Sequence, residues 1–207
     1  MSDALITYHT RIDSYEALQA YADLYNLVEH RLYAQMLAGE KPENLKSQCL
    51  VKYGITARQF NAISMNLKGK ISSAHALAKE HVKETKLRIK DCDRRIDREQ
   101  DTFKRHNLRR RQHGLATKHK RLTEQPKSIC FGTRKRFNAQ FDSTVDHGEW
   151  LQDWKRSRSN QFYVIGSHDE VSGCQGCVAT IESDGFLTLR LRIPNALISA
   201  YGKYVTI

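Results

Sequence analysis

The stretch "LKGKISSAHALAKEHVKETKLRIKDCDRRI", residues 67–96, decides the organisation of the chain. Its apolar and small residues recur at steps of three or four, which is the period of a helix with one buried face. The members of this stripe are Leu67, Ile71, Ala74, Ala78, Val82, Thr85, Ile89, Cys92 and Ile96. Because several of them are small or polar, the stripe predicts a coiled-coil-like but weak seam. We expect a turn near 102–108, after which "RRRQHGLATKHKRL" returns antiparallel.

Further helices are predicted before this hairpin. Asp13, with Glu16 three residues later, is the expected N-cap of a helix that stops at Gly39. Its predicted apolar stripe, at helical spacing, consists of Leu18, Tyr21, Ala22, Tyr25, Val28, Leu32 and Met36. A turn is predicted at Gly54, and Thr56 is expected to cap the next helix. Residues 4–12 alternate in polarity instead, and so predict a half-buried strand.

Pro126 marks a change to strand-like patterns. The segments "SICFG", "QFYVIGS", "CVATIES" and "FLTLRLRI" predict strands, interrupted by one helix, "HGEWLQDWKRSRSNQ". Asp184-Gly185 lies between two alternating runs and predicts a hairpin turn. The expected fold class is therefore α+β. The expected domains are 1–12 as the first strand of a β-domain, 13–123 as a helical insertion, and 124–207 as the remainder of the β-domain.

Charge is the strongest indication of a partner. The formal net charge is +11, and residues 79–127 hold 17 Lys and Arg against 8 Asp and Glu. A solvated hairpin can be basic without function, but such concentration on one element favours a polyphosphate partner lying along it. The run Arg109, Arg110 and Arg111 is part of this excess. A membrane surface is less favoured, because no segment joins basic residues to a wide apolar face.

Two shorter segments combine cations with aromatic rings. "ICFGTRKRFNAQF" (129–141) places Arg134, Lys135 and Arg136 among three phenylalanines, which suits phosphate contact and base stacking. The predicted helix near 150 carries two tryptophans four residues apart, Trp150 and Trp154. The cations Lys155, Arg156 and Arg158 follow them. The alternative is that the rings belong to the core and that the cations interact favourably with the helix dipole.

Catalytic and metal-binding patterns are not found in the sequence. There is no phosphate-binding loop, no HExxH, and no Ser–His–Asp order. Cys174 and Cys177 supply only two zinc ligands, so we expect no metal site. Five cysteines, no apolar run of membrane-spanning length and no signal-peptide pattern favour a cytoplasmic protein. We expect the chain not to be an enzyme.

Four segments resemble the N-terminal half of TnpB-related transposon proteins, relatives of the type V CRISPR effectors. They are "KYGITARQFNAI", "KSICFGTRKRFNAQF", "EWLQDWKRSRSNQFYVIGSHDEVSGCQGC" and "DGFLTLRLRIP". The resemblance implies a wedge-like antiparallel β-barrel split by a helical recognition lobe, which together hold guide RNA and a duplex motif flanking the target. The family's RuvC-like nuclease half, with its Mg and Zn, has no counterpart among these residues, so no cofactor is expected here.

The resemblance also implies contact residues. Those expected near the flanking duplex are Tyr53, Arg58, Gln59, Asn61, Lys68 and Lys70. Amide side chains can read adenine and arginine can read guanine, although helix capping and solvation explain the same residues. The resulting hypothesis is an RNA- and duplex-DNA-binding portion of a TnpB-like system, with a separate nuclease half as a possible partner. The alternative is a protein-interaction module that dimerises or docks a partner through the 67–123 hairpin.

Overall fold

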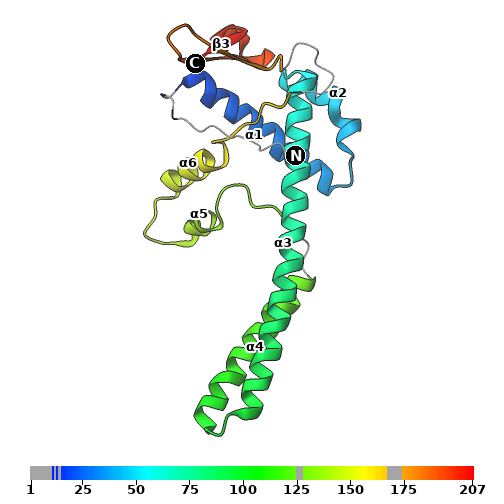
Figure 1. The fold of residues 1–207 in the computed structure, drawn as a ribbon, viewed down its shortest axis with the longest axis vertical. Helices are drawn as coiled ribbons and strands as arrows, with labels where there is room; N and C mark the ends of the chain where they lie inside the picture. The colour runs from blue at the N-terminus through cyan, green and yellow to red at the C-terminus, as the bar shows by residue number, and fades with distance from the viewer. Residues whose placement is uncertain (1–10, 12, 14, 125–127, 167–173) are drawn as a thin grey trace. The chain divides into compact units, whose positions relative to one another are not determined.

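The computed structural model describes residues 11, 13, 15–124, 128–166 and 174–207. Its helical part comprises α1 (Glu16–Leu37), α2 (Pro42–Tyr53), α3 (Ala57–Arg98), α4 (Thr102–Glu124), α5 (Arg134–Asn138), η1 (Ala139–Phe141) and α6 (His147–Arg158). The C-terminal part comprises β1 (Cys177–Ile181), β2 (Leu187–Arg192), η2 (Asn195–Leu197), α7 (Ile198–Tyr201) and β3 (Tyr204–Thr206). The fold class is α+β, as predicted (Figure 1).

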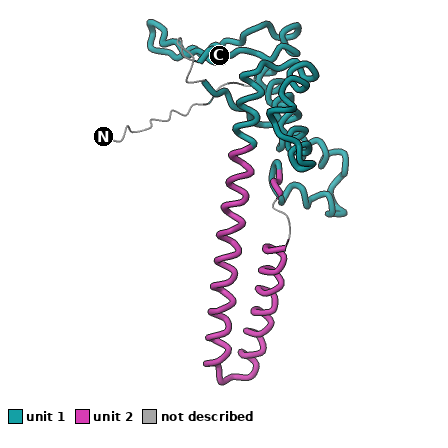
Figure 2. The backbone as a smooth tube through the Cα atoms, turned by 90° about the vertical axis from the view of Figure 1, so that its right-hand side faces the viewer, with its two compact units in different colours: residues 1–67, 131–207 teal, residues 68–130 magenta. Residues whose placement is uncertain are grey.

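The chain forms two compact units (Figure 2). Unit 1 comprises residues 1–67 and 131–207, and unit 2 comprises residues 68–130. Helix α3 contributes its first turns to unit 1 and its remainder to unit 2. This division differs from the predicted one at 13–123, because α1 and α2 group with the C-terminal segments rather than with the hairpin.

The core of unit 1 is built around α1. Its predicted helical stripe is buried at Tyr21, Ala22, Tyr25, Val28 and Leu32. Polar contacts fix this helix as well. The buried Glu29 accepts a hydrogen bond of 2.8 Å from Nδ2 of Asn66 on α3, and Nδ2 of Asn26 donates to the Gln161 carbonyl at 2.7 Å. The helix itself begins at Glu16, after Tyr15 rather than at a cap by Asp13.

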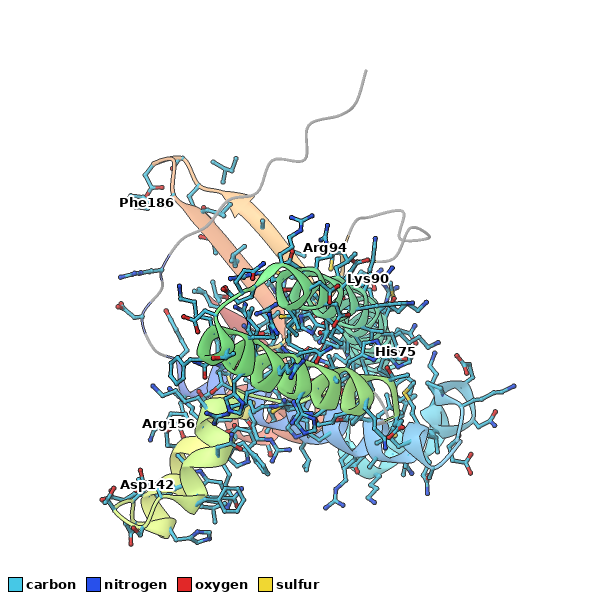
Figure 3. The ribbon with its side chains drawn as sticks, turned by 90° about the horizontal axis from the view of Figure 1, so that it is seen from below. His75, Lys90, Arg94, Asp142, Arg156 and Phe186 are labelled. Atoms are coloured by element: carbon cyan, nitrogen blue, oxygen red, sulfur yellow. The ribbon has the colours of Figure 1, made fainter. Side chains whose placement is uncertain are left out.

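The strands of unit 1 form a three-stranded antiparallel sheet in the order β1-β2-β3. Cys177 pairs with Leu191 and Ile181 with Leu187, so the predicted Asp184-Gly185 turn closes a hairpin. The apolar face of this hairpin is buried at Leu191 and becomes exposed towards Phe186 at the tip (Figure 3).

The described strands make an open sheet, so the expectation of a closed barrel is wrong for the described part of the chain. Residues 128–132 and 161–166 are not strands, contrary to the prediction. Their aromatic residues pack on helix α1 instead. Phe131 lies 4.1 Å from His30 and Phe162 lies 4.3 Å from Tyr21, measured between ring centroids. The predicted strand over 4–12 lies outside the described residues, apart from Arg11.

Unit 2 is the helical hairpin of α3 and α4, which lie side by side in Figures 1 and 2. Every residue of the predicted α3 stripe is buried or half-buried, as expected. Helix α4 adds Leu108, Leu115 and Leu122 at seven-residue spacing, and Gln112 hydrogen-bonds Asp93 across the seam.

The turn of the hairpin spans 99–101, earlier than predicted. Asp101 begins α4, because its carboxylate accepts from the backbone N–H groups of Phe103 at 2.8 Å and Lys104 at 3.0 Å. Among the described residues, no helix has the length and apolar character that crossing a bilayer requires.

Candidate nucleic-acid interface

Helix α4 is the most basic element of the structure. Its 23 residues carry eight Lys and Arg side chains and a single acid, Glu124. Seven of the eight cations are exposed and, within the described part of the chain, join no ion pair. They are Lys104, Arg109, Arg110, Arg111, Lys118, Lys120 and Arg121. The eighth, Arg105, is held at the turn, where its Nε donates to the Glu99 carbonyl at 3.0 Å.

The seven exposed cations, here called the α4 cations, form rows along the helix. Steps of seven and eleven residues return to nearly the same side of an α-helix. Lys104, Arg111 and Lys118 are seven apart, and Arg110 and Arg121 are eleven apart. Each row therefore presents positive charge at intervals of about 10–16 Å along the helix axis.

The α3 arm of the hairpin adds a second, more neutral surface. Lys79, Lys83, Lys86 and Lys90 are exposed at helical spacing. Figure 3 labels His75, Lys90 and Arg94 on α3. Two arginines are paired with acids on their own helix, since Arg88 lies 3.4 Å from Glu84 and Arg94 lies 3.3 Å from Asp91. Charge on α3 is thus partly compensated, whereas charge on α4 is not.

The segment containing Arg134, Lys135 and Arg136 is a short helix, α5, rather than a loop. Thr133 caps it, accepting from the Arg136 N–H at 3.3 Å. Arg136 is fixed against α6, because it pairs with Asp153 at 3.5 Å and its carbonyl accepts from Trp150 Nε1 at 2.7 Å. Arg134 and Lys135 stay exposed.

The tryptophan pair of α6 is mostly structural. Trp154 is 8% exposed and packs against Phe137, with ring centroids 5.6 Å apart. Arg158 lies over the Trp154 ring at 5.3 Å, and its Nη2 is 3.3 Å from Nδ1 of His30. Only the half-buried Trp150 keeps part of its surface in solvent. The neighbouring cations Lys155 and Arg156 are exposed, and Figure 3 shows Arg156 at the surface of α6.

The residues expected near a flanking duplex lie at the junction of α2 and α3. Gln59 is 8% exposed and forms a capping box with Thr56. Its Oε1 accepts from the Thr56 N–H at 2.9 Å, while Thr56 Oγ1 accepts from the Gln59 N–H at 3.2 Å. The Gln59 amide is therefore committed to the fold.

The other members of this set remain accessible to different degrees. Asn61 and Arg58 are exposed on the first turns of α3. Tyr53 is half-buried, with the Lys52 ammonium 5.5 Å from its ring centroid. Lys68 and Lys70 lie further along α3, and both interact with other groups in the chain.

The basic region was predicted from the sequence. Of the α4 cations, however, only Arg109, Arg110 and Arg111 were predicted as contact residues. Their seven- and eleven-residue spacing was the signal available in the sequence. Among the described residues no group of three or more His, Cys, Asp or Glu side chains is placed to share a metal ion. Burial raises the pKa of the Cys177 thiol, and the neighbouring Cys174 raises it further.

No protein-family model, curated protein or solved structure matches this chain. The resemblance to TnpB-related proteins therefore rests on the quoted segments alone.

Proposed function

We propose that the unit 2 hairpin binds the phosphate backbone of a nucleic acid, with α4 as the contact element. The observation that carries this proposal is the set of α4 cations, exposed and without acidic partners in the described part of the chain. Such a surface gains free energy when condensed counterions are released from a polyphosphate. Contacts of cationic side chains with phosphates carry no sequence information, so binding is expected to be largely independent of sequence.

A duplex fits this surface better than a single strand. Single-strand binding relies on exposed aromatic rings that stack on bases. The hairpin's exposed aromatic residue among those described is Phe103, at the first turn of α4. A helix of 23 residues is about 35 Å long, comparable with one turn of duplex at roughly 34 Å. The α4 cations can then reach phosphates wherever the backbones of the duplex pass the helix within about one turn.

Salt dependence tests the proposal directly. If about four α4 cations each neutralise one phosphate, affinity for a short duplex falls roughly 100-fold between 50 and 200 mM salt. Fluorescence anisotropy with a labelled duplex measures this slope. An affinity that hardly changes over this range would rule out backbone binding.

A matched pair of variants locates the surface. The double substitution Arg110→Gln and Arg121→Gln removes two uncompensated cations, and we expect the salt slope to decrease by between about one and two. The control, Arg88→Gln with Arg94→Gln, removes the same charge from the same unit, but each of these arginines is already paired with an acid. Equal losses in both double variants would mean that net charge, rather than α4, determines binding.

The narrower function is proposed from the resemblance alone: the guide-RNA- and flanking-duplex-binding portion of a TnpB-like system, without nuclease activity of its own. Its support is the order of the quoted segments. Purification without nuclease treatment, followed by sequencing of bound RNA, tests it. One dominant structured RNA is the expected result, and a random RNA population would contradict the guide-RNA role.

The alternative of a protein-interaction hairpin is less well supported. Leu77 and Leu87 are 59% and 58% exposed on α3. They are ten residues apart, which separates them by about 15 Å along the helix axis and about 80° around it, so these two side chains alone form no continuous apolar stripe. Light scattering of nuclease-treated protein tests this alternative, for which a dimer independent of nucleic acid is the required result.

A further inference from the structure

Unit 1 contains a pocket that has no part in the proposed backbone binding. Its volume is about 180 Å³, and it lies where α1, the start of α3, the extended segment at 163–165 and the end of β2 meet. The described lining residues are Tyr21, Thr56, Arg58, Gln59, Ala62, Tyr163, Val164, Ile165, Gln175, Gly176 and Arg192. All belong to unit 1.

The charge of this lining is one-sided. It includes two guanidinium groups, from Arg58 and Arg192, and no carboxylate among its described residues. The Nε of Arg192 is shielded from solvent and has no hydrogen-bond partner. A guanidinium keeps its proton at any physiological pH, and although the Arg192 side chain as a whole is half-buried, its shielded Nε–H is a donor without an acceptor among the described residues. An anion entering the pocket would supply it.

The neighbouring Arg190 shows the contrast on the same strand. Its guanidinium lies 4.0 Å from the centroid of the Tyr204 ring and is thus held by a cation–π contact outside the pocket. Residues Arg190 and Arg192 are two apart on β2, in the same three-stranded sheet. Arg192, unlike Arg190, lines the pocket and has an Nε that is shielded from solvent and lacks a hydrogen-bond partner.

The remaining lining is suited to a neutral ring. Tyr163, Val164 and Ile165 supply aromatic and aliphatic surface. Burial raises the pKa of Tyr21 to about 12, while its side-chain hydrogen bond with Gln59 acts in the opposite direction. At about 180 Å³, the pocket has room for more than a phosphate group alone.

We propose that this pocket binds the phosphate of a 5′-nucleotide, with Arg58 and Arg192 around the phosphate and the 163–165 segment against the base or sugar. Planar guanidinium groups match phosphate oxygens bidentately, which favours phosphate over a single-point anion. Two kinds of ligand carry such a 5′-phosphate: a free mononucleotide and the phosphorylated 5′ end of a nucleic-acid strand. The pocket and the α4 cations lie in different units, so neither proposal depends on the other.

The test uses the full chain and isothermal titration calorimetry. Adenosine 5′-monophosphate is expected to bind more tightly than adenosine or inorganic phosphate, because only it offers both parts. A 5′-phosphorylated octanucleotide that competes with it would identify a strand end as the source. If the octanucleotide binds equally with and without its phosphate, the free nucleotide is the ligand. No heat and no competition at millimolar adenosine 5′-monophosphate would overturn the proposal.

Variants assign the binding to the pocket. Arg192→Gln is expected to weaken nucleotide binding at least about tenfold, whereas Arg190→Gln on the same strand leaves it unchanged. Arg192→Lys should restore part of it. If Arg192→Gln does not fold, as judged by circular dichroism, Arg58→Gln at the exposed first turn of α3 replaces it. Equal binding by all of these proteins would overturn the assignment. The α4 double variant should bind the nucleotide normally, so failure of one proposal is distinguishable from failure of the other.

Discussion

Gly54 joins α2 to α3, and its conformation is one that other residues adopt only with strain. It has φ of +57°, and a Cβ added there would lie 2.9 Å from both the Cβ and the backbone nitrogen of Ala196. The Gly54 carbonyl accepts a hydrogen bond of 3.0 Å from that nitrogen, so the close approach is part of the fold. We expect Gly54→Ala to lower the free energy of unfolding by about 2–4 kcal/mol, measured by urea denaturation.

Gly39 provides the matched control for this prediction. It also has a positive φ, +96°, but a Cβ there meets nothing within 4 Å. Gly39→Ala should therefore cost only the backbone strain, about 1 kcal/mol. Equal costs at the two positions would show that the contact with Ala196 contributes nothing.

At the level of residues, the sequence predicted caps better than contacts. A turn at Gly54 and a cap at Thr56 are confirmed, because both follow from local backbone requirements. The expectation that Gln59 reads a duplex competes with the use of the same amide in the capping box. The capping box is a local pattern of Thr56 and Gln59, whereas the contact of Gln59 Nε2 with the Arg192 carbonyl, at 3.5 Å and 133 residues away, is one that no local pattern reveals.

Among the elements of the fold, the hairpin of α3 and α4 is the one whose stability can be predicted best from the sequence. Leu115 is 9% exposed and is the residue of α4 that lies deepest in the seam. We expect Leu115→Ala to reduce the local stability of the hairpin by about 2–3 kcal/mol, since large-to-small changes remove apolar contacts and leave a cavity. Hydrogen exchange of α4 amides measures this loss.

Leu87→Ala is the control, because it makes the same change at a side chain that is 58% exposed on α3. Its effect should stay within about 0.5 kcal/mol. A loss as large as that of Leu115→Ala would mean that the seam lies elsewhere on the two helices.

Strands were predicted less well than helices, for a physical reason. The stripe over 67–96 is a long local repeat, and it fixed α3 correctly. In "SICFG" and "QFYVIGS", alternating apolar residues suggested strands, but Phe131 and Phe162 instead pack on His30 and Tyr21 of α1. Alternating polarity indicates that one side of a segment is buried. A helix packed against that side buries it as well as a neighbouring strand does. The partner more than a hundred residues away decides between them.

At the scale of the whole molecule, α3 runs through two units with different interiors. In unit 1 its Phe60, Ile63 and Leu67 are 2%, 1% and 0% exposed. In unit 2 its stripe contains smaller or polar members such as Ala74, Ala78 and Thr85. Since local stability follows the apolar contacts around a segment, the two parts of one continuous helix should open with different free energies.

Hydrogen exchange along α3 tests this difference. Amides in 57–67 are expected to exchange at least about tenfold more slowly than amides in 75–98, equivalent to a difference of about 1.4 kcal/mol in opening free energy. Peptides from α1, which packs in the same unit as 57–67, should share the slower rate. Uniform protection along all of α3 would mean that both units open together. In the expected case the hairpin is the less stable unit, and a bound duplex should slow exchange at 102–124 while leaving 57–67 unchanged, since only the bound unit is stabilised by mass action.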